Sequence, residues 1–403
     1  MASLPSSPLK PLRSDHPRMI DLPKGFTHHV ANIGIKDGTD DFVVVTARHP
    51  VPCAAMFTKS RFAGPSVTLS QAHVADGMAQ AVVVISKNSN VATGPDGVSD
   101  AHEVAASVAG RLGAATTDVV VTSTGVIGRR YPMDRVRTGI GGLPSAPSGR
   151  NALAVATGMM TTDTVAKVAS AHIAGSDATV VGMAKGVGMI EPDMATHISI
   201  VFTDAELTST ELDAAFRRVV DRTFNCVSID TDTSTSDSSV VLASGDAGAV
   251  DLDAFETALH TVCLDLTKQI ARDGEGANSL IEVTVDRAAD VAQAKRVAKV
   301  IVNSPLVKTA VHGGDPNWGR VAMAIGKCSD DTDIDQDAVV IRFGDSEVYP
   351  NLLSDTDLAA LSGYMKSDHV VIHVSLSTGD AQSTVYGCDL SDTYVRFNAD
   401  YTT

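Results

Sequence analysis

Short runs of β-branched and other apolar residues recur along the chain and predict β-strands. They occupy residues 42–46, 81–85, 119–122, 198–202, 281–285, 339–343 and 370–374. Between them, apolar residues spaced three and four positions apart predict helices. These are clearest over 255–270, where the pattern stops at Gly274, and over 212–220 behind Thr210. The alternation of helices and strands predicts a layered α/β fold, although the pattern does not set the order of the strands.

The composition supports a large folded unit. With 403 residues, 44% of them hydrophobic, the chain can bury a substantial core as one large or two intimately joined domains, without a metal or a disulfide. The five cysteines include no Cys-x-x-Cys pair, so we expect reduced, buried thiols in a cytoplasmic protein. Residues 1–20 hold several prolines and lack the apolar core of a signal peptide, so they are predicted to be a flexible tail.

The net charge of the chain limits the classes of molecule that it is expected to bind. A formal net charge of -16 would repel a nucleic-acid backbone and an anionic membrane surface, so neither is an expected partner. The sequence also has no run of about 18 apolar residues, the length that a membrane span requires. Small amino acids with a cationic end fit this charge better.

Residues 185–196, Lys-Gly-Val-Gly-Met-Ile-Glu-Pro-Asp-Met-Ala-Thr, end in a small residue followed by threonine near the middle of the chain. The Thr196 hydroxyl could attack the carbonyl carbon of Ala195 and move the acyl bond from nitrogen to oxygen. Hydrolysis would then leave Thr196 as a new N-terminus. Its freed α-amine, with a pKa of roughly 7.7 to 8.0, could accept the hydroxyl proton when Thr196 attacks an acyl substrate. On these residues alone, an ordinary glycine-rich loop is the alternative.

Further positions offer groups that acyl transfer needs. Thr124 and Gly125 follow a predicted strand and present a hydroxyl and an unshielded N–H to a tetrahedral oxyanion, for which each fixed donor is worth about 3–4 kcal/mol. A plain strand-ending turn is the alternative. Lys185 could hold a substrate carboxylate, although a lone lysine is commonly a solvated surface residue. Glu275, between two glycines at a helix end, suits an ammonium group or simply belongs to a capping loop.

No metal site is predicted. Residues 230–234 have the ligand spacing of a calcium loop, but Thr235 stands where the loop needs glycine and Val241 where it needs glutamate. His197 is expected to be a packing or loop residue rather than a general base, since the α-amine of Thr196 already fills that role. Residues 315–320, which contain the only tryptophan, are expected to support the site by packing and by an ion pair of Arg320.

Several segments resemble the ornithine acetyltransferase (ArgJ-type) family, in the order that this family has them. Besides residues 185–196, which match its cleavage motif, they are Ser-Thr-Gly-Val-Ile-Gly (123–128), Met-Thr-Thr-Asp (160–163), Asp-Thr-Asp-Thr-Ser-Thr (230–235), Asp-Gly-Glu-Gly-Ala (273–277), Asp-Pro-Asn-Trp-Gly-Arg (315–320) and Asn-Ala-Asp-Tyr-Thr-Thr (398–403). The resemblance runs from about Gly25 to the end of the sequence. It implies a layered αββα sandwich similar to that of N-terminal-nucleophile hydrolases, but with a topology of its own.

The same resemblance implies that the chain cuts itself between Ala195 and Thr196. The products would be an α-subunit, residues 21–195 behind the tail, and a β-subunit, residues 196–403, which in the family stay together as an α2β2 or larger assembly. Thr196 would take acetyl from N2-acetylornithine, release ornithine and pass the acetyl group to glutamate. This ping-pong exchange needs no cofactor, because an amide donor and an amine acceptor react through the enzyme ester.

The resemblance also implies the residues of the site. Thr124 and Gly125 would form the oxyanion hole beside the catalytic Thr196. The residues expected to contact substrate are Thr161, Lys185, Thr196, Glu275, Asn398 and Thr403. Because the family folds its last residues back into the active site, we expect an ordered C-terminus, although chain ends commonly fray.

Some segments depart from the family members of primary metabolism. Residues 86–90 read Ser-Lys-Asn-Ser-Asn in place of Ser-Gly-Asn-Ala-Asn, and residues 386–389 begin with tyrosine in place of tryptophan. These features, with residues 61–65 and 307–313, look more like the paralogue associated with clavulanic-acid biosynthesis and favour a role in secondary metabolism. Two other functions stay open: an N-terminal-nucleophile amidohydrolase or aminopeptidase, and an uncleaved binding protein.

Overall fold

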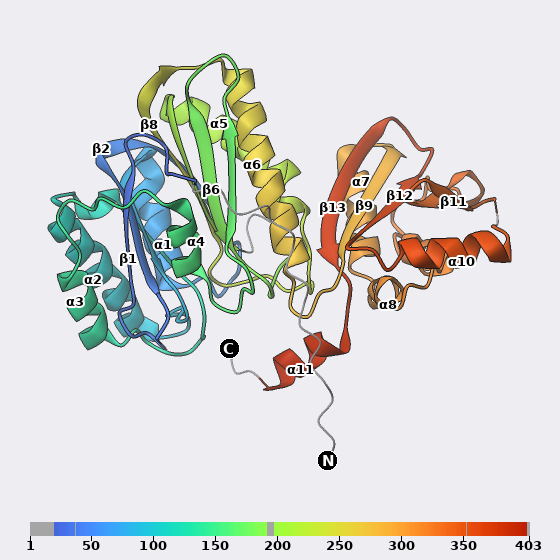
Figure 1. The fold of residues 1–403 in the computed structure, drawn as a ribbon, viewed down its shortest axis with the longest axis horizontal. Coiled ribbons are helices and arrows are strands. Elements are labelled where there is room, and N and C mark those ends of the chain that lie inside the picture. The colour runs from blue at the N-terminus through green and yellow to red at the C-terminus, as the bar shows by residue number, and fades with distance from the viewer. Residues whose placement is uncertain (1–19, 37, 192–196, 352, 401–403) are drawn as a thin grey trace.

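The computed structural model describes residues 20–36, 38–191, 197–351 and 353–400. These residues form two domains, a larger one that contains strands β1 to β8 and a smaller one that contains β9 to β13 (Figure 1). Helix α6 of the larger domain packs against β9 and β13 of the smaller one. The chain therefore adopts the arrangement of two intimately joined domains, one of the two that its length and composition allow.

The larger domain is built on one eight-stranded sheet. The strand order is β4-β3-β2-β8-β7-β6-β5, with β1 paired to β2. The strands are β1 Thr27–Ala31, β2 Phe42–Phe57, β3 Met78–Ile85, β4 Val119–Ser123, β5 Lys167–His172, β6 Thr179–Lys185, β7 Ile198–Glu206 and β8 Ser238–Ala249. Strand β2 is long: residues 42–46 and 51–52 pair with β3, whereas residues 53–57 pair with β8. This strand therefore joins two halves of the sheet.

The two halves stack on one another, with helices outside. Val43 and Val45 of β2 share a core with Ile200 of β7, whereas Phe42 and Val44, on the opposite face, pack on helices. The helices are α1 Pro65–His73, α2 Gly94–Leu112, α3 Met133–Gly141, α4 Ala152–Met159, α5 Ser209–Arg222 and α6 Leu252–Arg272. Helices α1, α2 and α3 cover one half, α5 and α6 cover the other, and α4 packs between the halves. The layers are therefore α, β, β and α, and the predicted sandwich is confirmed.

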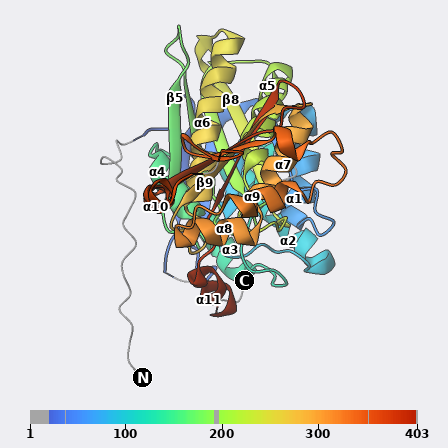
Figure 2. The same cartoon turned by 90° about the vertical axis from the view of Figure 1, so that its right-hand side faces the viewer.

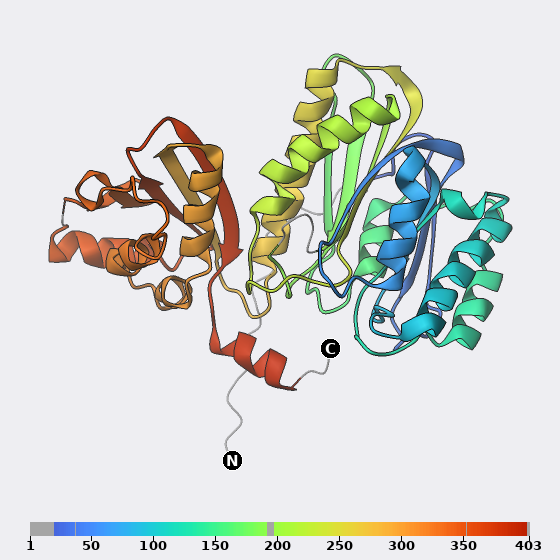
Figure 3. The same cartoon turned by 180° about the vertical axis from the view of Figure 1, so that it is seen from behind.

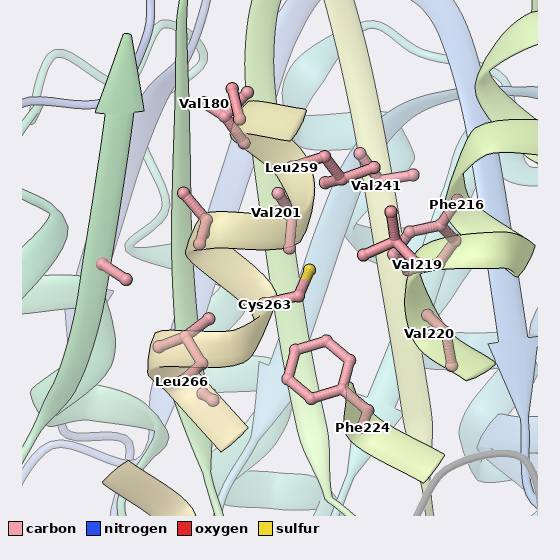
Figure 4. Packing of buried hydrophobic residues seen from close by; sticks show 14 of the residues in the cluster. Val180, Val201, Phe216, Val219, Val220, Phe224, Val241, Leu259, Cys263 and Leu266 are labelled. Atoms are coloured by element: carbon pink, nitrogen blue, oxygen red, sulfur yellow. The ribbon is translucent and has the colours of Figure 1, made fainter. Parts of the chain in front are cut away.

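Figure 4 shows the packing between the β5–β8 half of the sheet and its two helices. Val201 and Val241, on neighbouring strands, belong to one cluster with Phe216 and Val219 of α5 and Leu259 of α6. Each large apolar side chain that is fully buried in this way contributes about 1.5–3 kcal/mol. Because the central strands are buried on both faces, their sequences read as continuous apolar runs, which is the pattern that predicts them.

Helix α5 begins at Ser209, one residue earlier than the sequence pattern predicts. Thr208 is its N-cap and accepts the N–H of Glu211, whose carboxylate in turn accepts the N–H of Thr208. This reciprocal capping box satisfies two N–H groups that a helix start leaves unpaired. Thr210, the expected start, lies inside the first turn.

The smaller domain has a five-stranded sheet in the order β11-β10-β12-β9-β13. Its strands are β9 Leu280–Ala288, β10 Val340–Phe343, β11 Ser346–Tyr349, β12 His369–Ser375 and β13 Ala381–Cys388. The helices of this part of the chain are α7 Val291–Val302, α8 Pro305–Gly313, α9 Trp318–Ile325 and α10 Asp355–Tyr364 (Figures 2 and 3). A last helix, α11 (Asp392–Asp400), leaves this domain and lies below the junction of the two domains (Figure 1).

Some expectations from the sequence are wrong. Cys328 is partly exposed, whereas the other cysteines are buried as expected. Arg320 makes no ion pair within the described part of the chain, because its guanidinium donates to the carbonyl of Leu306 at 2.7 Å instead. Trp318 stacks on Tyr349 and belongs to the smaller domain. Among the described residues we find no helix that combines the length and the apolar character of a membrane span.

Candidate active site

Several strand ends meet at one edge of the larger domain. Lys185 ends β6 and pairs with Ile198, which begins the antiparallel strand β7. Ile198 also lies beside Ser238, which begins β8. In the other half of the sheet, β4 ends at Ser123. The segments that enter and leave these strand ends carry polar residues, and these residues surround one cavity.

The cavity has a volume of ≈ 160 Å³. Its walls come from the turns after β4 and β6, the segment before β8, the loop after α6 and helix α11. Six of the residues predicted from the sequence line it: Thr124, Gly125, Thr161, Lys185, Glu275 and Asn398. The tertiary structure therefore gathers into one site residues that lie far apart in the sequence.

Thr124 and Gly125 form a tight turn after β4. The Thr124 N–H donates to the carbonyl of Ile85 at 3.1 Å. Gly125 has a φ of 132°, and a Cβ there would lie 2.2 Å from the carbonyl carbon of Lys87, so only glycine fits. The Gly125 N–H donates no hydrogen bond to another described residue, and Gly125 lines the cavity, as an oxyanion donor requires.

Lys185 is partly buried at the end of β6. Its Nζ lies 3.5 Å from Oγ1 of Thr124, so the lysine and the candidate oxyanion hole are neighbours. Burial lowers the pKa of Lys185, while the negative charges of nearby acids, Asp163 first among them, act in the opposite direction. An ammonium group that has lost part of its water shell gains more from an anionic ligand than a solvated one does.

Glu275 and Asn398 meet in the cavity wall. The Asn398 Nδ2 donates to the Glu275 carboxylate at 2.8 Å, which ties α11 to the loop after α6. The Glu275 N–H donates to the carbonyl of Val187 at 2.9 Å, and a Cβ at Gly188 would lie 2.8 Å from Cδ of Glu275. Burial raises the pKa of Glu275. Glu275 is thus an acid whose position is set by two other segments of the chain.

A cluster of buried charges, not predicted from the sequence, lies behind Thr161. Lys167 of β5 is completely buried, with Nζ 2.7 Å from Asp163 and 2.6 Å from Asp273. Asp163 also accepts the N–H groups of Thr161 at 3.0 Å and Gly186 at 2.7 Å. The cluster therefore connects the loop that carries Thr161 with the turn that follows β6.

The segment with calcium-loop spacing has a structural role. The Asp230 carboxylate accepts the N–H groups of Met189 at 2.6 Å and Ile190 at 2.7 Å, and so braces the glycine-rich turn of the cleavage motif. Within the described ranges, no group of three histidine, cysteine, aspartate or glutamate side chains could hold a metal ion.

Two buried residues next to the cavity carry side-chain atoms without a hydrogen-bond partner among the described residues. The His197 ring packs 4.3 Å from the ring of Phe224, and neither of its nitrogens is bonded. Burial, and then the charge of Lys185, lowers the pKa of His197 to about 3, so the ring is neutral and packs as expected. Asp237 has an unbonded Oδ2, and burial raises its pKa well above the ordinary value. The sequence carries no local signal for Asp237.

Ala195, Thr196 and Thr403 lie outside the described residues, so the scission site and the role of the last residue stay predictions. Their sequence neighbours are informative. His197, the residue after Thr196, lines the cavity, and so does Asn398 of the terminal helix. Tyr394 of the same helix is a further lining residue that sequence reasoning missed.

Comparison with known proteins identifies the family. Residues 27–403 match the ArgJ family. The arginine biosynthesis bifunctional protein ArgJ 2 of Nostoc sp. is 53% identical over 94% of this chain and 98% of its own. Glutamate N-acetyltransferase Oat2 of Streptomyces clavuligerus is 55% identical over 94% of this chain and 98% of its own. A crystal structure of the arginine biosynthesis bifunctional protein ArgJ from Bacillus halodurans has 40% identity and a TM-score of 0.46, covering 49% of this chain and 96% of that one. The chain belongs to the ArgJ family, and the resemblance found in the sequence is confirmed.

Proposed function

We propose that this protein is a self-processing acetyltransferase that moves acetyl from N2-acetylornithine to glutamate through an ester on Thr196. The observation that carries the proposal is the cavity next to His197, which a threonine–glycine turn, a lysine and a glutamate line together. Relatives that share more than half of their residues with this chain are named glutamate N-acetyltransferase and arginine biosynthesis bifunctional protein. These names favour acetyl transfer over the amidohydrolase and over the uncleaved binding protein.

In the first half-reaction, the Thr196 hydroxyl gives its proton to the α-amine of the same residue and attacks the acetyl carbonyl carbon. The oxyanion accepts hydrogen bonds from the Gly125 N–H and the Thr124 hydroxyl. The Lys185 Nζ lies where it can donate to the Thr124 Oγ1. The hydroxyl hydrogen of Thr124 is therefore free to donate to the oxyanion. The carbon–nitrogen bond then breaks, the leaving amine takes the proton from the α-ammonium, and ornithine departs.

In the second half-reaction, the neutral amine of glutamate attacks the ester carbonyl carbon. The same oxyanion hole holds the charge, the carbon–oxygen bond breaks, and the Thr196 oxygen recovers a proton from the attacking amine through the α-amine. The products are N-acetylglutamate and free enzyme. The atoms balance without a cofactor, since acetyl passes from one nitrogen to another.

Opposite charges on the cavity wall match the substrates. Lys185 pairs with a substrate carboxylate, and Glu275 with the side-chain ammonium group of the ornithine moiety. Thr161, Asn398 and Thr403 supply further hydrogen bonds. Donor and acceptor both carry an α-carboxylate, so one lysine serves both in turn, and the departure of ornithine vacates the place that glutamate takes.

The proposal also covers self-processing, oligomeric assembly, cellular location and metabolic role. The fragments 1–195, whose residues 21–195 form the α-subunit, and 196–403 would stay joined because β6 and β7, which lie on either side of the cut, pair along their lengths. An α2β2 or larger assembly, a cytoplasmic location and a role in arginine biosynthesis complete the proposal. A secondary-metabolism role stays a prediction from residues 86–90 and the other departures.

The test uses purified protein with acetylornithine, with and without glutamate, and mass spectrometry of products and protein. We expect N-acetylglutamate only when both substrates are present, and a gain of about 42 Da, one acetyl group, on the C-terminal fragment with donor alone. Hydrolysis of the donor that glutamate does not affect would overturn the transferase in favour of the amidohydrolase. A parallel sample with acetyl-CoA in place of acetylornithine shows whether a second donor is used.

A further inference from the structure

The buried cluster of Asp163, Lys167 and Asp273 has a composition that stability alone does not explain. Their side chains are 0%, 0% and 4% exposed, and two carboxylates share one ammonium group. Taking charges out of water costs several kcal/mol per ion, and apolar residues of similar volume often serve stability as well. Because this cluster lies next to the cavity, we looked to the residues that line the cavity for its function.

Asp163 reaches the cavity wall through the backbone. One carboxylate oxygen accepts the Gly186 N–H at 2.7 Å in addition to Lys167, and the other accepts the Thr161 N–H at 3.0 Å. Gly186 follows Lys185 and has a φ of 151°, a backbone conformation that favours glycine. The carboxylate therefore holds the turn in which β6 ends, and with it the direction of the Lys185 side chain.

Asp163 also differs from the other acids near Lys185 in the direction in which its pKa is shifted. The titratable groups that act on Lys185, or on which it acts, are Asp163, Lys167, Asp237, Glu275 and His197. Burial raises the pKa of both Asp237 and Glu275. Burial acts in the same direction on Asp163, but Lys167, Lys185 and the Gly186 N–H together hold the pKa of Asp163 below its ordinary value. Among these described acids, Asp163 is the one whose pKa is lowered, so its anionic form is the most strongly favoured.

We propose that Asp163 is a positioning residue for Lys185: its carboxylate fixes the turn after β6 and supplies a negative charge that stabilises the ammonium group of Lys185 in the cavity. Lys167 and Asp273 hold Asp163 in place, since Lys167 joins the two carboxylates and Asp273 accepts the Thr164 N–H at 3.1 Å. The role of Lys185 toward a substrate carboxylate rests on the proposed function. The effect of Asp163 on the charge of Lys185 does not depend on the proposed function.

The experiment measures the titration of Lys185 in the unliganded protein by NMR with ¹³C-labelled lysine, assigned from the signal that Lys185→Arg removes. Asp163→Asn is nearly isosteric and can still accept a hydrogen bond from the Gly186 N–H. We expect this variant to lower the pKa of Lys185 by about 1–3 pH units, the effect of losing an opposite charge nearby. With substrate, the rise of KM on the alkaline side then begins at a correspondingly lower pH, while kcat changes less.

Asp273→Asn is the matched control. It removes the other carboxylate from Lys167 in the same buried cluster, yet Asp273 is not among the groups that shift the pKa of Lys185. Asp273→Asn should therefore leave the titration of Lys185 where it is in the wild type. Equal shifts in the two variants, or none in Asp163→Asn, would overturn the proposal and leave Asp163 a structural residue.

A variant that keeps the charge covers the case in which Asp163→Asn does not fold. Asp163→Glu keeps a carboxylate that can pair with Lys167, so the pKa of Lys185 should stay within about 1 pH unit of the wild-type value, and a larger fall with this charge retained would overturn the proposal. The titration of Lys185 needs no turnover. The proposed function and the proposed role of Asp163 can therefore be rejected independently of each other. A wild type without self-cleavage or acetyl transfer would reject the proposed function and leave the Lys185 titration to decide on Asp163.

Discussion

Lys185 pairs directly with Ile198 in the antiparallel register of β6 and β7, although the predicted scission lies between them in the sequence. The strand before the cut and the strand after it are therefore neighbours in one sheet. Both strands are buried in the same domain core. A cut between residues 195 and 196 would open the chain without separating the two parts of the sheet.

The first prediction concerns this cut. Wild-type protein should give two bands on a denaturing gel, fragments 1–195 and 196–403, and one particle that contains both fragments in native mass spectrometry. Thr196→Ala should give a single full-length band, because it lacks the attacking hydroxyl. Thr257→Ala, which removes an exposed threonine hydroxyl from α6, should be cut like the wild type. An uncut but active wild type would contradict the mechanism.

The second prediction concerns the charge of Glu275. Glu275→Gln should raise KM for acetylornithine about tenfold to a hundredfold, since a hydrogen bond to a charged group contributes about 1.5–3 kcal/mol, and should change kcat much less. Glu256→Gln, which removes a carboxylate bound to Arg218 and Arg222 on the surface, is the control and should leave KM unchanged. Steady-state kinetics with each variant separates these outcomes.

Glu275 also predicts a pH dependence of donor binding. Because burial raises the pKa of Glu275, its carboxylate takes up a proton at a higher pH than an exposed glutamate does. Donor affinity should be complete above this raised pKa and should weaken as pH falls through it. The acidic rise of KM should be absent from Glu275→Gln. If both proteins show the same acidic limb, another group is responsible for it.

The third prediction concerns the oxyanion turn. In Gly125→Ala, the new methyl group would overlap the Lys87 backbone, so the turn must move and the N–H must leave its place. We expect kcat/KM to fall by a factor of about 100 to 1,000, as for other lost oxyanion donors. Gly128→Ala has a similar backbone penalty, with a φ of 79° but no atom within 4 Å of the added Cβ, and should retain most of the activity. Equal losses in both variants would assign the effect to backbone strain.

The fourth prediction concerns His197 and acid stability. The pKa of His197 is about 3 in the folded protein and about 6.5 when unfolded, because burial disfavours its charged form. The unfolded chain therefore binds an additional proton between these values, so stability is lost as pH falls from about 6.5 toward 3. His197→Phe should flatten this part of the curve of melting temperature against pH. An unchanged acid slope would show that His197 is not buried in its neutral form.

The fifth prediction concerns Lys167. Lys167→Met leaves two buried carboxylates without their shared cation and should destabilise the larger domain by about 3–5 kcal/mol in urea unfolding. Adding Asp273→Asn should recover part of this loss, because one unpaired charge is then removed. Arg217→Met breaks an exposed ion pair with Asp213 and should have little effect. A mild Lys167→Met variant would mean that the carboxylates are protonated or hydrated.

The fold could be predicted only in part from local patterns. The predicted apolar runs all fall on strands, except that Val339 precedes β10. Strands β3 and β4 are buried on both faces and are apolar for that reason, whereas β9, β10 and β12 alternate between buried and partly exposed residues. Strand β8 was missed because it opens with Ser238 and Ser239 and contains glycines, and β6 because a glycine interrupts its apolar residues. These strands owe their conformation to pairing with β7, a contact that no local pattern contains.

The candidate site divides in the same way. Gly125, Lys185 and Glu275 can be found in the sequence because each lies in or beside a glycine turn, where the backbone needs a conformation that other residues resist. Asp163, Lys167 and Asp237 cannot be assigned in this way, since an acid or a lysine has the same letter whether it is buried or solvated. Burial and the distance to the nearest opposite charge decide its pKa.

Local sequence was sufficient for the class of fold, the family, the glycine turns and the candidate nucleophile, because these depend on residues that are near one another along the chain. The tertiary structure alone decided that strand ends from both halves of the sheet surround one cavity and that Asn398 reaches Glu275. It also decided that the pKa of Asp163 is lowered while that of Asp237 is raised. The reason is physical: electrostatic energies inside a protein depend on distance and on the exclusion of water, and both are properties of the folded chain.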